Sequence, residues 1–275
     1  MNKSILYLIS IFLISQACTD ETAESPFVNT VVVAAYIYAG QPAKNFKVTR
    51  LIPFNADSTD EFYINDAEID IIHNEKPYRL ILSPGDSGYY HYPGEDLRIL
   101  ASETYELRMN YFGEEINAFT TVPEKPDGLE ITTQELFVEP IYEFFDLRNR
   151  NIGDVDILWS NDHAEYYYVL IDNVETNPTN IDVNGILENF KGGRNFSFIT
   201  QPTQLDIYRM RGFNLQQYGT HRATLFKVNQ EYADLYESNE QDSRDLNEPL
   251  NNINNGLGIF TSFNSDSLFF EVSVP

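Results

Sequence analysis

Apolar and polar residues alternate along several short segments of residues 27–122, which is the pattern of strands with one buried face. In residues 104–111 the aromatic and aliphatic side chains take every second position, and polar side chains take the positions between them. Residues 31–38 form an almost unbroken β-branched and aromatic run, which predicts a buried first strand. Four further strands, of which the second and third form a predicted hairpin, lie at residues 46–52, 68–73, 78–82 and 116–122. Short strands at this spacing favour a β-sandwich over a parallel sheet.

Residues 123–128 contain two prolines and a glycine, which cannot continue a central strand, and they predict a linker between two domains. The second domain, residues 129–275, is predicted to contain strands at residues 154–160, 165–173, 223–228, 256–260 and 268–274. Residues 229–236 predict one short helix, with Asn229 as its N-cap. A strand that carries the only tryptophan, followed by a tyrosine-rich strand, resembles part of a fibronectin type III sandwich. The predicted fold class is mainly β, with two immunoglobulin- or fibronectin-III-like sandwiches and one short helix in the second.

The start of the chain predicts export across a membrane. Lys3 is followed by an apolar run over residues 5–14, which suits the core of a signal peptide and is too short to span a bilayer. Ala17 then precedes Cys18, the only cysteine of the protein, in the arrangement of a bacterial lipoprotein signal. We therefore expect removal of residues 1–17 and lipidation of Cys18, with an ordinary secretory signal and a chance cysteine as the alternative.

Residues 18–26 are small and acidic, and they predict a flexible tether between the lipid and the first domain. Acidic residues directly after a lipidated cysteine also resemble the export signals of Bacteroidota lipoproteins that reach the outer face of the outer membrane. The expected location is therefore the outer membrane, lipid-anchored and exposed at the cell surface. The periplasmic face of the same membrane stays the alternative.

The formal net charge of −24 narrows the range of partners. A chain this acidic is repelled by phosphate backbones and by anionic lipids, so we expect no nucleic-acid partner and a membrane attachment that depends on a covalent anchor. A single cysteine forms no internal disulfide, so burial of apolar surface must stabilise the fold. Aromatic residues make up 14% of the chain, which favours packed β-structure over an acidic disordered chain.

The chain shows no catalytic motif, and we expect a protein that is not an enzyme. The four histidines lie in unrelated predicted elements, and surface positions on strands or loops explain His73, His91, His163 and His221. A Gly-x-Ser-x-Gly elbow is missing from the sequence, and a lipidated Cys18 is not available as a nucleophile. The 42 Asp and Glu residues are too numerous for any one pair to indicate a glycosidase.

One acidic loop is a candidate metal site. Asp57, Asp60 and Glu61 lie close together in the sequence, and hard oxygen ligands at such spacing suit Ca²⁺. The full spacing of an EF-hand and its glycine are missing, so we expect a solvated acidic turn and no cofactor, with calcium as the alternative.

A tyrosine-rich loop is the candidate ligand-binding site. Tyr89, Tyr90 and Tyr92 lie between Gly88 and Gly94. Tyrosines offer a large amphipathic contact area at low entropic cost, which suits a glycan or peptide ligand. The alternative is a strand whose tyrosines pack against the sandwich.

Six blocks of sequence resemble those of a known family, and they lie at residues 31–36, 92–107, 118–123, 159, 231–236 and 252–260. The last block is the most specific, since the others fit many β-sandwiches. Their order resembles a family of Bacteroidota lipoproteins known as domain of unknown function 4249. The resemblance implies β-sandwich domains, a lipoprotein facing the surface or the periplasm, and association with TonB-dependent outer-membrane transporters. It implies no catalytic residue.

The main hypothesis is a non-enzymatic outer-membrane surface lipoprotein that serves as an accessory or binding partner of a TonB-dependent transporter barrel in nutrient uptake. A first alternative is a lipid-anchored surface hydrolase acting on glycan or peptide. A second alternative is an adhesin or envelope-assembly protein.

Overall fold

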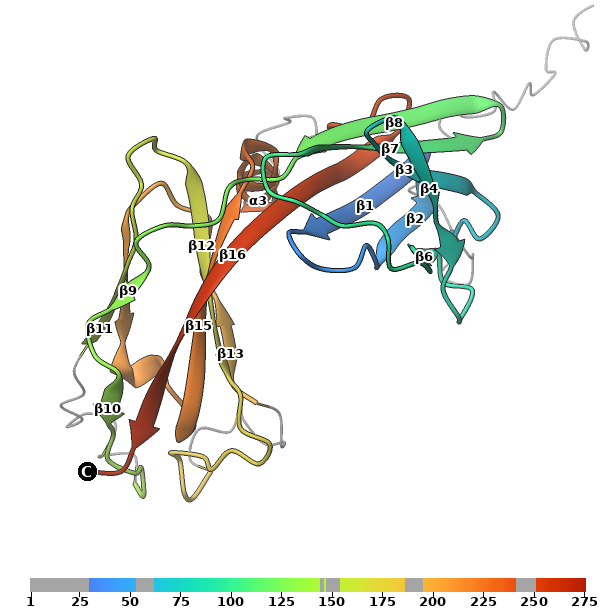
Figure 1. Cartoon of the computed structure of the whole chain (residues 1–275). Helices are drawn as coiled ribbons and strands as arrows, with labels where there is room; N and C mark the ends of the chain where they lie inside the picture. Colours follow the sequence, from blue (N-terminus) through green and yellow to red (C-terminus); the bar gives the residue numbers. More distant parts are fainter. Residues whose placement is uncertain (1–29, 53–61, 144–145, 147–153, 186–194, 241–250) are drawn as a thin grey trace, which may run out of the picture.

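The computed structural model describes residues 30–52, 62–143, 146, 154–185, 195–240 and 251–275 (Figure 1). In this part the chain is mainly β-structure with one α-helix. None of the described helices is long and apolar enough to cross a membrane. The predicted fold class, mainly β with sandwich-like packing and one short helix, is confirmed.

The first half of the chain forms eight strands. They are β1 (Val31–Tyr38), β2 (Phe46–Arg50), β3 (Glu68–His73), β4 (Lys76–Arg79), β5 (Ile81–Leu82), β6 (Tyr89–His91), β7 (Thr104–Tyr111) and β8 (Glu114–Thr121). The predicted hairpin is present, because β3 and β4 pair antiparallel.

The described part of the second half adds eight strands, a 3₁₀ turn and the helix. These elements are β9 (Glu130–Ile131), β10 (Glu135–Phe137), β11 (Asp154–Leu158), β12 (Tyr166–Asn173), β13 (Ser197–Ile199), β14 (Ile207–Arg211), η2 (Gly212–Asn214), β15 (Gly219–Val228), α3 (Gln230–Glu240) and β16 (Leu257–Ser273).

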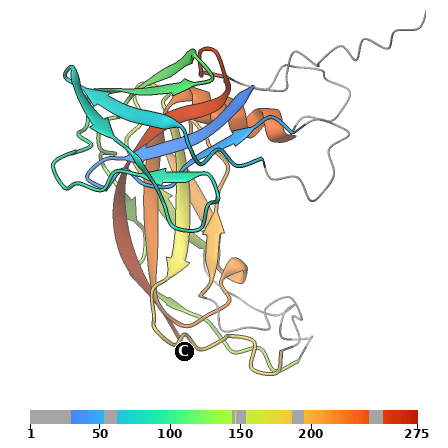
Figure 2. The same ribbon diagram turned by 90° about the vertical axis from the view of Figure 1, so that its right-hand side faces the viewer.

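The strands form one large sheet and two small ones. The nine-stranded sheet has the order β13-β12-β15-β16-β1-β2-β6-β5, with β10 paired to β16 off this path. A four-stranded sheet, β4-β3-β7-β8, packs on the first half of the large sheet, and a three-stranded sheet, β14-β11-β9, packs on the second half. The strands of the first half cross the top of the long strands of the second half (Figure 2).

Strand β16 belongs to both halves of the molecule. Its first residues pair in parallel with β1, from Val32 opposite Leu257 to Tyr38 opposite Phe263. Its remaining residues pair antiparallel with β15 (Figure 1). At 17 residues it is far longer than an ordinary strand. Residues 257–263 therefore lie in the sheet of the first half, although they come after the linker that the sequence predicts.

Alternation along the strands builds two apolar cores. Every second residue of β1 is buried, and these side chains meet those of β3 and β7, including Ile71, Tyr105 and Leu107, at 2% exposure or less. The predicted inward face of residues 104–111 is thus confirmed for its first three members, while Tyr111 is only partly buried. The second core gathers side chains from β11, β12, β15 and β16 around Trp159.

The polar middle of β16 lies where the linker crosses it. Ser262 Oγ donates to Thr121 O at 3.0 Å, and Asn264 Nδ2 donates to Pro123 O at 2.9 Å. Lys125 forms an ion pair with Asp266 at 2.9 Å. Two separate strands are predicted from the sequence here because a polar stretch interrupts the apolar pattern. The structure shows one strand whose polar side chains satisfy the linker backbone.

Helix α3 packs over an aromatic cluster on the face of the large sheet that lies opposite the linker. The Phe263 ring stacks on Tyr38 at a centroid distance of 4.9 Å and meets Tyr232 of the helix edge-on at 4.9 Å. Tyr168 and Phe226 stack at 4.8 Å beside them. The cluster joins rings from β1, β12, β15, β16 and α3, so it stabilises the junction of the two halves. Burial raises the pKa of the Tyr232 phenol to about 12.

Asn229 lies directly before α3, where the sequence places the N-cap. Its backbone carbonyl accepts from Tyr232 N at 3.1 Å, as expected for an N-cap residue. Its side-chain amide nitrogen lies 3.0 Å from Thr120 Oγ1 and 3.1 Å from Ser262 Oγ. The side-chain nitrogen therefore connects the start of the helix to β8 and β16.

His221 is fully buried, which corrects the expectation of a surface position. Its Nδ1 lies 2.9 Å from Gly219 O, and its ring stacks on Phe270. Burial lowers the pKa of the imidazole and outweighs the attraction of the nearby Asp172 and Glu175 carboxylates.

We predict that Gly258→Ala disrupts the β1–β16 pairing. Gly258 has φ +111°, and a Cβ there would lie 1.9 Å from Val33 O. Gly40→Ala is the matched control, because Gly40 also has positive φ, +72°, but nothing lies within 4 Å of its Cβ position. Urea unfolding should show a loss of about 1–2 kcal/mol for the control and roughly 1–3 kcal/mol more for Gly258→Ala. Equal losses would contradict the close approach.

We also predict a pH-dependent contribution of His221 to stability. Because its folded-state pKa is lowered, its contribution is complete above the unfolded pKa of about 6.5 and is lost as the pH falls below that value. His221→Leu should therefore lose less stability than the wild type between pH 7.5 and pH 5.5 in urea unfolding. His163→Leu, at an exposed site, should keep the wild-type slope. The same slope for all three proteins would contradict the burial of a neutral imidazole.

Candidate functional site

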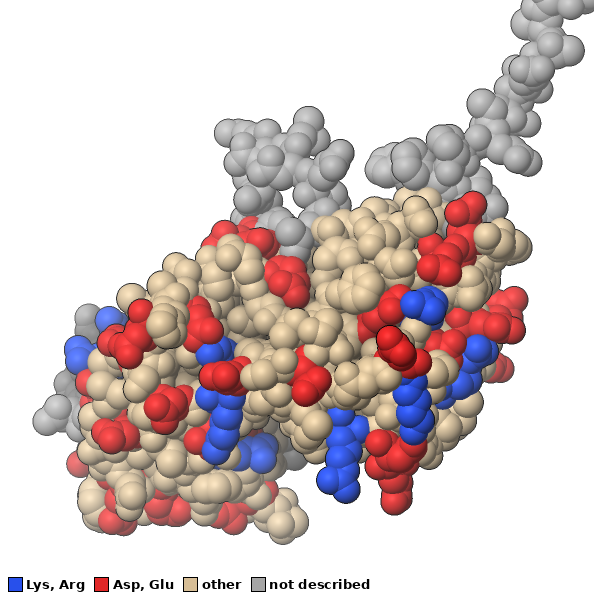
Figure 3. Space-filling view, turned by 45° about the horizontal axis from the view of Figure 1, so that its top comes forward, with Lys and Arg blue, Asp and Glu red and all other residues tan. Residues whose placement is uncertain are grey.

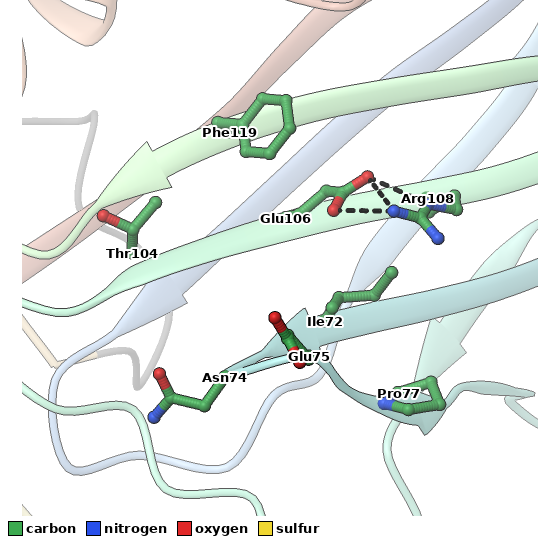
Figure 4. A pocket seen from close by; sticks show the side chains of 8 residues that line it. All are labelled: Ile72, Asn74, Glu75, Pro77, Thr104, Glu106, Arg108 and Phe119. Atoms are coloured by element: carbon green, nitrogen blue, oxygen red, sulfur yellow. Dashed lines mark hydrogen bonds and ion pairs between the residues drawn. The ribbon is translucent and has the colours of Figure 1, made fainter.

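A surface pocket of about 460 Å³ lies on the outer face of the four-stranded sheet, and we call it the sheet pocket (Figure 4). One row of cross-strand partners forms its floor, in which Ile72 lies between Pro77 and Glu106. Phe119 extends the row on the far side of Glu106. The four strands thus contribute one side chain each to this row. Asn74, Glu75, Thr104 and Arg108 complete the rim.

A bidentate ion pair lies in the middle of the sheet pocket. Arg108 Nε lies 2.9 Å from one carboxylate oxygen of Glu106, and Arg108 Nη2 lies 2.9 Å from the other. The two residues are two apart on β7, so both side chains project from the same face. The Glu106 side chain is only 14% exposed, against 42% for Arg108. The pair therefore presents a fixed acceptor and free guanidinium N–H groups to a ligand.

The apolar part of the sheet pocket stands beside this pair. Phe119 is 55% exposed, although its neighbours on the outer face of β8 are polar. The Asn74–Glu75 turn forms the nearby rim, and both residues have positive φ, 49° and 62°. This is the arrangement of a two-residue type I′ turn, for which asparagine is a favoured first residue. The pocket can bind a molecule that has one apolar face and several hydrogen-bonding groups.

The lining of the sheet pocket contains no serine, cysteine, lysine or histidine, and its one hydroxyl group, Thr104 Oγ1, lies 2.9 Å from Thr121 Oγ1. Nor does the described part of the chain bring three His, Cys, Asp or Glu side chains together in a way that could hold a metal ion.

A second pocket, of about 520 Å³, lies where the linker meets the second half. Its lining includes Pro123 and Glu124 of the linker, and Asn229 and Gln230 at the start of α3. Lys227 in its wall is bonded to the Glu165 carboxylate, and its side chain is only 12% exposed. Its lysine is therefore already paired, and its lining joins the linker to the start of α3.

The structure separates the three tyrosines of the predicted ligand-binding loop. Tyr90 is 2% exposed, its hydroxyl donates to Ile64 O at 2.9 Å, and it accepts from Ala67 N at 3.1 Å. Burial raises the pKa of its phenol. Tyr90 is therefore a core residue and not a surface contact, because successive side chains of β6 point to opposite faces.

Tyr89 and Tyr92 are half-buried, and each contacts different residues. Lys47 Nζ stands 5.7 Å from the Tyr89 ring centroid. The Tyr92 hydroxyl donates to Asp96, and its ring meets Tyr78 edge-on. Hydrogen bonds from Lys76 and Tyr92 lower the pKa of the Asp96 carboxyl to about 2. Neither tyrosine belongs to the sheet pocket.

The remaining predicted site residues, Cys18, Asp57, Asp60 and Glu61, lie outside the described residues. Conversely, the sequence analysis did not single out Phe119, Glu106 or Arg108 as a site. A signal for them was present, because Phe119 breaks the polar face of β8. The register that places it beside Glu106 is not readable from local pattern.

The fold and the sheet pocket define a mainly β protein with two sandwich-like cores and an open pocket on one of its sheets. The family described as "Domain of unknown function (DUF4249)" matches residues 18–268, and the chain belongs to this family. The resemblance seen in the sequence is thereby confirmed.

No curated protein matches the chain. Among solved structures it is similar to the crystal structure of the chicken CNTN1 FN1-FN3 domains, at 10% sequence identity and a TM-score of 0.28. The similarity covers 74% of this chain and 60% of that chain. At this TM-score the likeness carries no argument about fold or function.

We predict that Tyr90→Phe destabilises the protein by about 1–3 kcal/mol, because it leaves Ile64 O and Ala67 N buried without their partner. Tyr89→Phe is the matched control on the same strand and should change stability by less than about 0.5 kcal/mol. Urea unfolding of both variants measures the difference. A neutral Tyr90→Phe variant would instead place this hydroxyl at the surface.

Proposed function

We propose that the protein is a non-enzymatic, lipid-anchored binding protein at the surface of the outer membrane, where it serves a TonB-dependent transporter in nutrient uptake. The observation that carries the proposal is the position of Cys18. It is the only cysteine of the chain, it directly follows a signal-peptide pattern, and the match to the family begins at this residue.

The sheet pocket supports a binding role. It combines an exposed aromatic ring, Phe119, with the fixed charges of Glu106 and Arg108, and it is open to solvent along the sheet (Figure 4). A glycan or a peptide offers the matching chemistry, since both have apolar patches beside hydrogen-bonding groups. The ligand would reach this face without a change of fold.

The charge of the chain supports a covalent anchor. Acidic side chains lie over both halves of the face shown in Figure 3, and the basic ones lie among them. Most described basic groups are paired with acids, as in Arg79 with Asp70 and Arg209 with Asp156. Among the described residues, pairing with acids leaves little basic surface for anionic lipid, which supports an attachment that depends on the lipid.

The test is an affinity purification from detergent-solubilised outer membranes, with a tag after Pro275. The proposal predicts that a TonB-dependent transporter co-purifies with the native protein and is lost or strongly reduced with Cys18→Ala. Thr19→Ala is the matched control, because it changes the neighbouring residue and keeps the cysteine.

Mass spectrometry of the same samples should show a lipid on residue 18 in the native and Thr19→Ala proteins. A protein that carries no lipid would contradict the anchor. A lipidated protein that purifies alone would contradict the transporter partnership, and screening of glycans and peptides on the sheet pocket would follow.

A further inference from the structure

The turn between β7 and β8 has an unfavourable residue at its tip. Tyr111 pairs with Glu114, so Phe112 and Gly113 form a two-residue turn, and their φ angles are 49° and 83°. Both central residues of a type I′ turn need positive φ, which a bulky side chain rarely adopts. The equivalent turn between β3 and β4 has the favoured asparagine, Asn74, at the same position and the same φ.

Phe112 is also the most exposed large apolar side chain among the described residues, at 69%. The Tyr111 ring packs edge-on against the Phe112 ring, with the two ring centroids 4.5 Å apart. A residue that is both strained and exposed lowers stability twice, once through its backbone and once through its contact with water. Such outliers collect at functional sites.

This turn lies at the end of the first half where β1 begins (Figure 1). The start of β1 adjoins the end of β2, with Leu51 N donating to Thr30 O at 2.8 Å. The start of β16 connects β1 to the hairpin, because Leu257 pairs with Val32 and Asn255 Nδ2 donates to Glu115 O. The turn, β1 and β2 therefore meet at one end, which we call the tether end.

A second apolar side chain is exposed at the tether end. Ile52 follows Leu51 directly and is 62% exposed. Eleven residues lie between Cys18 and Thr30, and a fully extended chain across these twelve steps reaches roughly 40 Å. A lipid on Cys18 would thus allow the tether end to reach the bilayer, while the ten residues of β16 that pair with β15 extend roughly 33 Å beyond the pairing with β1.

We propose that the tether end, where Phe112 is exposed in the β7–β8 turn and Ile52 is exposed after β2, inserts into the headgroup region of the bilayer. This inference rests on the lipid anchor of the proposed function. The side chains suit the membrane interface, where aromatic rings have one apolar and one hydrated environment. Insertion would orient the sheet pocket and the second half relative to the membrane and to a transporter in it.

The charges around the turn indicate which lipid headgroups the tether end would contact. Glu114, Glu115 and Asp66 are exposed there, and Arg50 is the nearby cation. The acidic excess disfavours anionic headgroups, so the contact is apolar and suits zwitterionic lipid.

Tryptophan substitutions test the inference in the lipidated full chain, reconstituted in phosphatidylcholine vesicles with brominated acyl chains. Phe112→Trp places the reporter at the tip. Phe269→Trp is the matched control, because Phe269 is 54% exposed but lies in the second half. The native Trp159 is 5% exposed and gives the background to subtract. We expect blue-shifted, bromine-quenched emission for Phe112→Trp and unquenched emission for Phe269→Trp.

Equal, weak quenching of both reporters in vesicle-bound protein would overturn the insertion and leave the anchor intact. A shift of the tip reporter only when a transporter is added would assign Phe112 to a protein contact and would also overturn it. Protein without lipid, shown by mass spectrometry and by failure to float with the vesicles, would overturn the proposed anchor and this inference with it.

A second variant separates insertion from folding. Phe112→Asn gives the turn the residue found in the β3–β4 turn, so the urea midpoint should rise or stay unchanged. Direct binding of the non-lipidated Cys18→Ala chain to the same vesicles should fall roughly tenfold on adding this change, because one buried phenylalanine is lost. Unchanged binding with a raised midpoint would contradict the inference.

Discussion

Strand β16 pairs with both halves of the molecule, and most other contacts between the halves depend on that pairing. Its first residues complete the sheet of the first half beside β1, and its later residues complete the sheet of the second half beside β15. Phe260 thereby enters one core, while Phe270 and Val272 enter the other. The linker follows the polar middle of the strand, and the aromatic cluster under α3 covers its opposite face. The two sandwiches thus share one hydrogen-bonded sheet and are not joined by the linker alone.

The first half of the molecule carries two surfaces with different chemistry. The sheet pocket offers Glu106, Arg108 and Phe119 on a flat sheet face of the first half. The tether end exposes Phe112 and Ile52 near the start of β1. One surface suits a soluble ligand, and the other suits an apolar environment. A rigid first half would hold both at a fixed distance and orientation, which is useful for a binding protein attached to a membrane.

Local pattern was sufficient to predict most strands, because period-two alternation reports one buried face directly, as in residues 104–111. It was insufficient wherever a distant segment decides burial. Residues 261–267 look like a gap between strands because they are mostly polar, and their polar side chains bond to Thr121 and Pro123, more than a hundred residues earlier. His221 looks like a surface histidine, yet the aromatic rings of Phe196 and Phe270 enclose it. Tyr90 and its neighbours look like one aromatic surface, yet strand geometry points them to opposite faces. The sheet pocket depends on register across four strands, which no local window contains.

The most direct test of this account is native-state hydrogen exchange, because the shared strand predicts one cooperative unit. Amides of Val33 and Phe260 in the first half, and of Leu225 and Phe270 in the second, should exchange with the same free energy and the same dependence on urea. Two groups of amides, one for each half and with different free energies, would show that the halves unfold independently. That result would contradict the central role of β16.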